Sequence, residues 1–242
     1  ITGSSVMPVL TGRMVFTLTV ETDGSYTFTL LDQIDHSDGN DPDSETLDID
    51  FSTYVQFTDF DQDVLTLSGG FTITVENDIP EQLSGTASGT LLVQEDALNN
   101  YDPGDTSPVD GIEGSAGNPE GGQTTVATGS LSNLVSVGAD EDGTFSLIEL
   151  TDAATTLSSK GDAITYTTSD EVGGDGILDT LTATAGGRTV FTLTVEPDGD
   201  YTFTLLDQID HLPNVPADDD DQELSIDFSS FVQFTDFDQD VL

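Results

Sequence analysis

Two blocks of this sequence occur twice, and the duplication constrains the fold more than any other feature. Residues 13–36 recur as residues 188–211 with three substitutions, and residues 47–65 recur as residues 224–242, again with three. The loop between the two blocks is two residues longer in the second copy. Near-identity on both sides of a loop that has changed length indicates tandem duplication of one structural unit.

The duplicated blocks carry the period-2 pattern of β-strands. In residues 15–20 apolar side chains alternate with threonines, and the alternation resumes in residues 26–30 after Asp23-Gly24. Two such strands joined by a short Asp-Gly loop predict a β-hairpin with one buried face. The pattern returns in residues 71–75 and, in the second half, at inward-facing pairs: Phe145 and Leu147, Ile164 and Tyr166, Leu181 and Ala183. No stretch has a sustained helical apolar stripe, so we predict an all-β fold, a two-sheet sandwich with Greek-key connections.

The repeat also sets the predicted domain organisation. Residues 1–80 correspond to the C-terminal part of one module plus a linker, and residues 81–242 to a second module. The first copy continues past Leu65 into a further strand, whereas the second copy stops at Leu242, so we expect a fragment whose second module lacks its last strand. An unpaired strand edge invites strand exchange between chains. Residues 1–12 match nothing before the second copy, so the repeat does not say whether they are native.

The chain is extremely acidic, with 47 Asp and Glu against 3 Lys and Arg and a formal net charge of -44. This charge excludes nucleic acids and anionic membrane surfaces as partners. The absence of an 18-residue apolar run argues against membrane insertion. A hydrophobic content of 35% favours folding over disorder, so something must offset the repulsion. Bound divalent cations and salt screening both do so, and both are available outside a marine or halotolerant cell. Without cysteine, disulfides and thiolate metal sites are excluded.

Residues 59–63, DFDQD, carry carboxylates at alternating positions, and residues 236–240 repeat them. Like charges on one side of an extended segment repel unless a cation lies between them, and Ca²⁺ prefers hard oxygen ligands. We expect the aromatic residue between the first two aspartates to point the other way and anchor the segment to the core. The pattern predicts two Ca²⁺ clusters: Asp59, Asp61 and Asp63, and Asp236, Asp238 and Asp240. The alternative is an acidic strand end that faces water.

Residues 76–80, ENDIP, follow the last strand of the first module and resemble cadherin-type joints, which share ions between an acidic loop, a linker and the next module. On this interpretation Asn77 and Asp78 close around the ion of the first acidic loop. Glu95 and Asp96, at the end of a predicted strand over residues 91–93, are the third contributor. The alternative is a plain turn.

Other acidic segments favour structural roles. Residues 140–143 and 175–179 are predicted turns, the latter with room for one ion, and residues 218–221 a solvated surface loop. Residues 99–122 are rich in Gly, Pro and Asp and predict a long loop that either wraps over the sandwich or holds ions.

Catalysis finds little support in the sequence. There is no GxSxG, no HExxH, no glycine-rich phosphate loop and no cysteine nucleophile. His36 and His211 are repeat equivalents in polar loops, which favours a structural role for both. A glycosidase pair would need one carboxyl with a raised pKa in an apolar cleft, whereas the acidic residues lie on turns. We therefore predict that the protein is not an enzyme.

Taken together, residues 111–131, the two duplicated blocks and the VENDIP linker resemble the tandem repeats of very large RTX adhesins, which Gram-negative biofilm-forming bacteria export by type I secretion. The resemblance implies Ig-like or cadherin-like extender domains at the cell surface that depend on Ca²⁺ and hold a terminal ligand-binding region away from the cell. Neighbouring repeats are the implied partners. The implied ligands are Asp59, Asp61, Asp63, Asn77 and Asp78, with Asp236, Asp238 and Asp240 as the second set. The competing hypothesis is a saccharide- or surface-binding module, which would need outward-facing aromatic residues beside a concave site.

Overall fold

A computed structural model of the chain describes residues 12–36, 46–98, 124–139, 142–211, 223–237 and 239–242. The all-β prediction is confirmed, since these residues form strands and short 3-10 turns and include no α-helix. The chain divides into two compact units, Ile1–Ile79 with Ala139–Glu141, and Pro80–Gly138 with Asp142–Leu242. Multiple antiparallel sheets are consistent with a β-sandwich, whereas the Greek-key and Ig-like details stay predictions.

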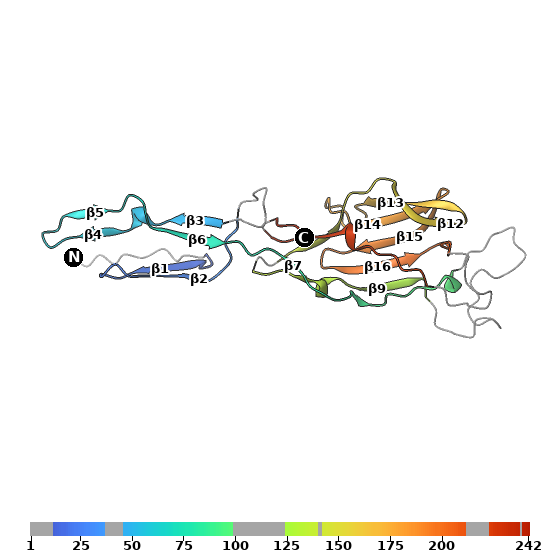
Figure 1. Cartoon of the computed structure of the whole chain (residues 1–242), viewed down its shortest axis with the longest axis horizontal. Helices are drawn as coiled ribbons and strands as arrows, with labels where there is room; N and C mark the ends of the chain where they lie inside the picture. Colours follow the sequence, from blue (N-terminus) through green and yellow to red (C-terminus); the bar gives the residue numbers. More distant parts are fainter. Residues whose placement is uncertain (1–11, 37–45, 99–123, 140–141, 212–222, 238) are drawn as a thin grey trace, which may run out of the picture. The chain divides into compact units, whose positions relative to one another are not determined.

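The first unit contains three antiparallel strand pairs (Figure 1). The pairs are β1 (Phe16–Val20) with β2 (Tyr26–Leu30), β3 (Thr46–Asp50) with β6 (Thr72–Glu76), and β4 (Gln56–Thr58) with β5 (Val64–Thr66). The predicted hairpin and the predicted strand at residues 71–75 are therefore confirmed. Five aromatic side chains hold β1 and β2 against β3 and β6, with ring centroids 4.8 to 6.1 Å apart: Phe16, Tyr26, Phe28, Phe51 and Phe71.

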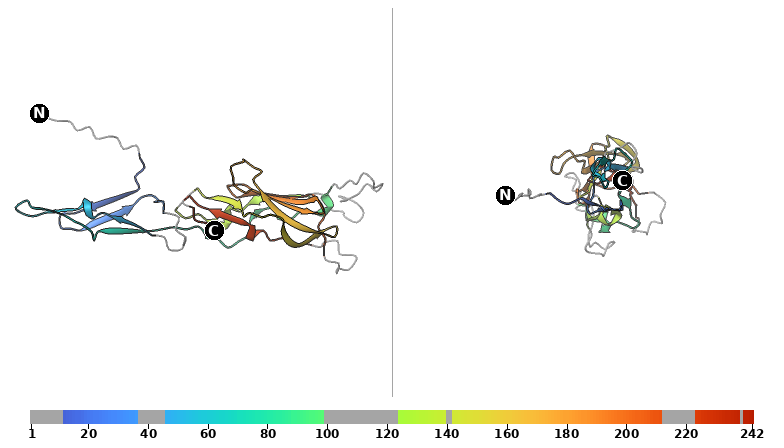
Figure 2. Two further views of the ribbon diagram at one scale, coloured as in Figure 1. Left: turned by 90° about the horizontal axis from the view of Figure 1, so that it is seen from above. Right: turned by 90° about the vertical axis from the view of Figure 1, so that its left-hand side faces the viewer.

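The second unit is built on a seven-stranded antiparallel sheet, ordered β12-β13-β14-β15-β16-β9-β8 (Figures 1 and 2). Two further strand pairs, β11 with β17 and β7 with β10, complete it. The bounds are β7 (Glu81–Gln82), β8 (Ser88–Gly89), β9 (Val126–Ser130), β10 (Val135–Ser136), β11 (Thr144–Leu147), β12 (Ala153–Ser159), β13 (Asp162–Ser169), β14 (Thr180–Ala185), β15 (Arg188–Val195), β16 (Asp200–Leu205) and β17 (Val232–Thr235).

A single hydrophobic core fills the second unit. The residues predicted to face inward are all buried: Phe145, Leu147, Ile164, Tyr166, Leu181 and Ala183. Phe191 lies among them and contacts Tyr166, Phe203 and Phe228 through ring pairs 5.1 to 6.0 Å apart. The alternation of apolar and threonine side chains thus produces the buried sheet face that it predicts.

The duplicated blocks share most of their local structure in both units, except that residues 46–50 form strand β3 whereas the equivalent residues 223–227 form no strand. In β1 and β2, Phe16 pairs with Leu30, and in β15 and β16 their equivalents Phe191 and Leu205 pair in the same register. The second block agrees as well, because Phe57 pairs with Leu65 and the equivalent Phe234 exchanges backbone hydrogen bonds with Leu242. Local sequence therefore determines the hairpin and the acidic turn in both copies, whereas the strand at residues 46–50 forms where it pairs with β6.

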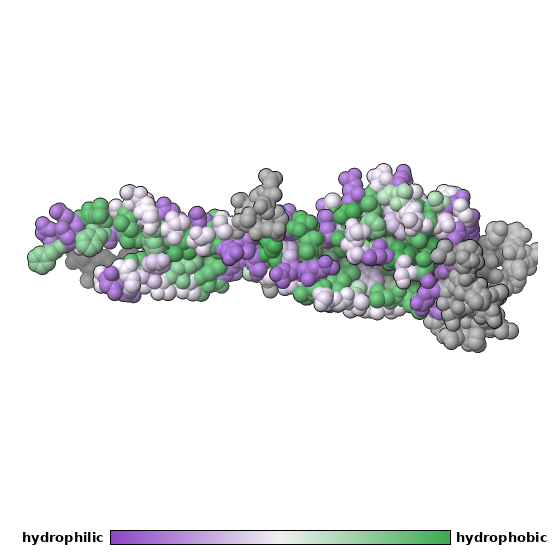
Figure 3. Space-filling view, viewed as in Figure 1, coloured by the Kyte–Doolittle hydropathy of each residue, from purple (hydrophilic) through white to green (hydrophobic). Residues whose placement is uncertain are grey.

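Burial differs sharply between the copies. Phe57 is 63% exposed in the first unit, whereas the equivalent Phe234 is 3% exposed in the second. Strand β11 explains the difference, since Phe145 stacks edge-on against Phe234 at 4.9 Å. Hydrophobic side chains accordingly lie on the surface of the first unit (Figure 3). The apolar face of the hairpin is buried in the second unit, apart from the half-buried Phe203, and is half-buried or exposed in the first unit.

Some expectations fail or fall outside the described residues. Residues 91–93 are not a strand, because only Thr90 and Gln94 donate backbone hydrogen bonds to the neighbouring segment and Leu91 and Leu92 are exposed. Residues 99–122, 140–141 and 218–221 lie outside the described residues. Within the described part of the chain, no helix has the length and apolar character needed to cross a membrane.

Candidate metal centre

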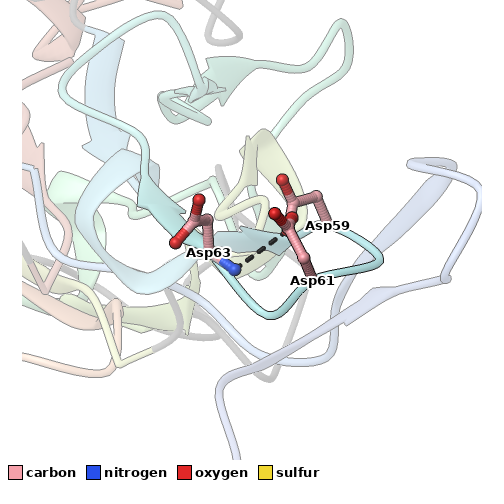
Figure 4. Close-up of side chains that lie close together, drawn as sticks. All are labelled: Asp59, Asp61 and Asp63. Carbon is pink, nitrogen blue, oxygen red and sulfur yellow. Dashed lines mark hydrogen bonds between the residues drawn. The ribbon is translucent and has the colours of Figure 1, made fainter.

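The first acidic loop is a tight turn between β4 and β5. The Asp59 N–H donates to the Asp63 carbonyl oxygen at 3.1 Å, and the Asp63 N–H donates back to Asp59 Oδ1 at 2.9 Å (Figure 4). Gln62 adopts a φ of 75°, a left-handed conformation that lets the chain reverse within five residues. The turn, and not the alternation of an extended strand, brings the carboxylates together.

Oxygen atoms of Asp59, Asp61 and Asp63 lie within 4.8 Å of one another, which is the spacing that one cation could bridge. All three residues are exposed. A side-chain hydrogen bond with Asp61 and the backbone N–H of Asp63 lower the pKa of Asp59 below its ordinary value. A lowered pKa favours the ionised form of the carboxylate, which is the form that binds a cation.

The second acidic loop repeats this conformation. The Asp236 N–H donates to the Asp240 carbonyl oxygen at 3.1 Å, the Asp240 N–H donates to Asp236 Oδ1 at 2.8 Å, and Gln239 has a φ of 85°. Asp236 is 3% and Asp240 8% exposed, so two carboxyl groups that are open to water in the first unit are buried here. Asp238 lies outside the described residues.

A hollow of about 540 Å³ lies beside the second acidic loop. Asp236 and Gln239 line one side, and the loop at Gly176 lines another. Among the described residues, the remaining lining is polar or aliphatic and includes no aromatic side chain: Thr144, Ser146, Leu147, Ile148, Glu149, Ile177, Leu178, Gln233 and Thr235.

The phenylalanine inside each acidic loop does not anchor it. Phe60 is fully exposed and Phe237 is 54% exposed, so the expectation that they point into the core is wrong. The physical reason is the turn itself: the residue after the first aspartate lies at the tip of the hairpin, beyond the last strand pairs of β4 and β5.

Asn77 and Asp78 do not join the first acidic cluster. They follow β6, whose last residue Glu76 pairs with Thr46, whereas the acidic loop lies beyond the opposite end of the β3–β6 ladder (Figures 1 and 2). One Asp78 carboxylate oxygen accepts the backbone N–H of Ala139 at 2.7 Å. The prediction that the linker and the loop of the same copy close around one ion is therefore wrong, because a full strand separates them.

Glu95 belongs to the second unit and has a structural partner there. In the 3-10 turn η3 (Glu95–Ala97), its Oε1 accepts the Ile209 N–H at 2.5 Å and lies 3.7 Å from His211 Nε2. The predicted role of Glu95 beside the first acidic loop stays a prediction, because that loop belongs to the other unit. The side chain of Asp96, the other predicted contributor, lies outside the described residues.

The predicted turn at residues 175–179 is held by carboxylates that accept backbone donors. Asp170 accepts the N–H groups of Gly174 and Gly176, and the buried Asp179 accepts those of Glu171 and Val172 at 3.1 and 2.7 Å. Carboxylates that organise a loop through several N–H groups perform a structural role without any ion. These contacts favour the turn interpretation of the segment.

Sequence reasoning missed one charged cluster. Asp207 is buried and receives Lys160 Nζ at 2.8 Å and the Arg188 guanidinium, so two of the three basic residues in the chain meet at one carboxylate. Burial alone would raise the pKa of Asp207, but hydrogen bonds from Lys160, the Gln208 N–H and Arg188 outweigh it and lower the pKa. The sequence contains a signal for this cluster, because the duplication keeps both the arginine and the aspartate. Arg13 and Asp32 form the equivalent ion pair in the first unit at 2.6 Å.

The two histidines make structural contacts. His36 Nε2 lies 3.3 Å from the Val75 carbonyl oxygen, and His211 lies beside Glu95. Comparisons with protein-family models, with curated proteins and with solved structures gave no match.

Proposed function

We propose that the chain is a structural spacer of a secreted cell-surface adhesin, made of tandem β-sandwich repeats stiffened by Ca²⁺ at the joints between modules. The observation that carries the proposal is the acidic loop, whose backbone is the same in both units although its surroundings differ. A loop whose conformation does not depend on its environment is a preorganised ligand for a cation.

Calcium suits this loop on chemical grounds. It takes six to eight oxygen ligands at flexible geometry, and three aspartates supply part of that number while water and backbone carbonyls supply the rest. With extracellular affinities of about 10⁻⁴ to 10⁻³ M and calcium near 10⁻² M, each filled site adds roughly 1.4 to 2.7 kcal/mol of stability. Because the chain has a net charge of -44, each bound cation also stabilises the fold by reducing the repulsion between carboxylates.

The adhesin context rests on the resemblance to RTX adhesin repeats, together with a cysteine-free, acidic, tandemly duplicated β chain. Under this proposal the protein is extracellular, acts without catalysis, and has neighbouring repeats as its partners. Its role in cell adhesion and biofilm formation is to hold a distal ligand-binding region away from the cell.

One observation favours a second candidate, a saccharide- or surface-binding module. Phe60 and Phe237 are exposed in both copies of the acidic loop, and an aromatic ring beside calcium-binding carboxylates is a feature that sugar recognition could use. Against it, the described residues that line the hollow next to Asp236 include no aromatic side chain. A glycan array with reproducible hits that disappear in Phe60→Ala would promote this candidate.

The spacer proposal is tested by calcium titration calorimetry on the whole chain at fixed ionic strength. The double variant Asp61→Asn/Asp63→Asn should lose the heat of one site, whereas the charge-matched control Asp23→Asn/Asp198→Asn should retain it. Asp23 and Asp198 each cap their own turn through a backbone N–H and lie in neither cluster.

Small-angle scattering of the same samples measures stiffness. Addition of excess EGTA should broaden the distribution of chain dimensions and lower the melting temperature. Calcium heats equal to the buffer blank, together with identical melting and scattering curves with and without EGTA, would sink the proposal.

A further inference from the structure

We propose that the hollow beside the second acidic loop binds linear aliphatic diamines, the chemical class to which polyamines belong. This site goes beyond the spacer role and does not rest on bound calcium. All of its lining residues belong to the second unit. Its volume of about 540 Å³ lies within the range of small-molecule pockets and is many times the space that one water molecule occupies. The hollow is therefore too large for a single metal ion and has the size for a small organic molecule.

The floor of the hollow is the outer face of the β11–β17 pair. In this pair Thr144 lies opposite Thr235 and Ser146 opposite Gln233, while the intervening Phe234 is buried in the core. Gln233 Nε2 donates a hydrogen bond to Ser146 Oγ at 3.1 Å, which orders two of these side chains. The floor thus offers neutral hydroxyl and amide groups, which form hydrogen bonds without adding charge.

An aliphatic wall borders this polar floor. The Leu147 N–H donates to the Leu178 carbonyl oxygen at 2.7 Å and joins the loop at residues 176–178 to β11. Ile148, Ile177 and Leu178 line the hollow and are half-buried. Such side chains offer no ligand atom to a bare cation, but they contact the methylene groups of an organic ligand and remove them from water.

Carboxylates lie at the two ends of the hollow. Asp236, which is 3% exposed, follows Thr235 at one end of the β11–β17 pair. Glu149, which is exposed, follows β11 at the other end. Extended chain advances about 3.4 Å per residue, so the stretch from Thr144 to Glu149 spans about 17 Å. A ligand that contacts both carboxylates is therefore elongated.

The charge of the hollow selects a cation. The described lining residues include no basic side chain, and Lys160 and Arg188 are both engaged at Asp207. In a chain of net charge -44, a hollow with a buried carboxylate has a negative potential that attracts cations. An ammonium group donates three hydrogen bonds, and its bonds to carboxylates are among the strong ones. A carbon chain with an ammonium group at each end therefore matches both carboxylates, the polar floor and the aliphatic wall.

The first unit contains a matched control for this site. Asp59 occupies the same turn as Asp236 and has the same backbone hydrogen bonds, but it is exposed and does not line the hollow. A ligand that needs only the acidic turn would bind both copies alike. A ligand that needs the hollow binds the second copy alone.

Isothermal titration calorimetry of the whole chain with diaminodecane tests the site, at fixed ionic strength and with EGTA present to remove calcium. Diaminodecane should bind, and diaminobutane, which has the same charge on a shorter chain, should bind about tenfold more weakly because it does not reach both carboxylates. Glu149→Gln removes one carboxylate and should weaken diaminodecane binding about tenfold. Ser146→Leu, which fills the floor from an outward-facing strand position, should weaken it as much.

The two equivalent aspartates provide the decisive comparison. Asp236→Asn should weaken the binding of diaminodecane, whereas Asp59→Asn should leave it unchanged. Asparagine keeps an oxygen that accepts the Asp240 N–H, so the turn itself is retained. No heat from diaminodecane, equal affinity for the two diamines, or equal binding by wild type, Glu149→Gln and Ser146→Leu would overturn the site. A loss in Asp59→Asn as large as that in Asp236→Asn would also overturn it, because binding would then follow charge alone. Since EGTA is present throughout, these outcomes are separate from the test of calcium at the joints.

Discussion

The two copies of the repeat are one sequence in two surroundings. The hairpin that ends at Leu30 or Leu205 and the acidic turn that follows Phe57 or Phe234 have the same conformation and pairing register in both copies, although strand β3 has no counterpart strand at residues 223–227. Their burial differs, because the second copy packs against strands β11 to β14 and the first copy has no equivalent cover among the described residues. The comparison separates what local sequence determines from what tertiary packing adds.

One consequence is that equivalent residues contribute unequally to stability. The backbone hydrogen bonds of the hairpin and of the acidic turn are common to both copies, so a difference between paired substitutions there reports the difference in side-chain surroundings. Each copy thus serves as a control for the other within one protein. Hydrogen exchange measured by mass spectrometry can follow the two copies separately in one sample, because the free energy of local opening differs between regions.

The largest expected difference is at the phenylalanine before the acidic loop. Phe234→Ala removes a buried ring that contacts Phe145 and should cost about 3 to 5 kcal/mol, whereas Phe57→Ala removes an exposed ring and should change stability by about 0.5 kcal/mol or less. Urea unfolding with exchange mass spectrometry on peptides from each unit measures both. Equal costs would mean that the cover by β11 does not form.

The next largest difference is at the shared ion pair. Asp207→Asn leaves Lys160 and Arg188 without a buried carboxylate and should cost about 1 to 3 kcal/mol, reduced from a fully buried pair because both cations are partly exposed. The equivalent Asp32→Asn, whose partner Arg13 is mostly exposed, should cost about 0 to 1 kcal/mol. Urea unfolding of both variants measures the two costs. A cost for Asp32→Asn as large as that for Asp207→Asn would contradict the role of burial.

The pH dependence of this effect has a defined sign. The folded pKa of Asp207 is below its ordinary value, so its stabilising contribution is complete above about pH 4, the unfolded value, and disappears as the pH falls through the folded value. The difference in urea midpoint between wild type and Asp207→Asn should therefore be constant from pH 7 to 5 and close below pH 4. A difference that grows in acid would reverse the assignment. Comparison of the two proteins at each pH cancels the general relief of repulsion that protonation brings to so acidic a chain.

The sequence predicted those features that depend on neighbouring residues. The hairpins, the strand at residues 71–75 and the inward positions from Phe145 to Ala183 follow from alternation and turn chemistry, which are local. The carboxylates of Asp59, Asp61 and Asp63 were grouped correctly, although for the wrong reason, since a turn and not an extended strand gathers them. These three residues are close in space because they are close in the sequence.

The predictions that fail concern contacts that depend on the direction and order of the strands. The position of Asn77 and Asp78 at the far end of β6 from the acidic loop follows from strand direction, which the spacing between the two motifs did not reveal. The cluster at Asp207 required Lys160, which lies outside the duplicated blocks, to return to the end of β15. Such contacts depend on the strand order of the whole sheet, and local patterns carry little information about it.

The smallest expected effect is at the loop tip, where the two copies agree in exposure. Phe60→Ala and Phe237→Ala should each change stability by about 0.5 kcal/mol or less, because both rings are open to water and neither packs on the core. This near-neutrality makes the pair informative about function. If the rings serve only as surface, calcium heats and glycan-array signals stay unchanged in both variants. A stable Phe60→Ala protein that loses a glycan signal would show that the tip binds a ligand, and the spacer would then carry a recognition site of its own. A loss of several kcal/mol in either variant would instead show that the ring is buried in solution, against the exposure seen in both copies.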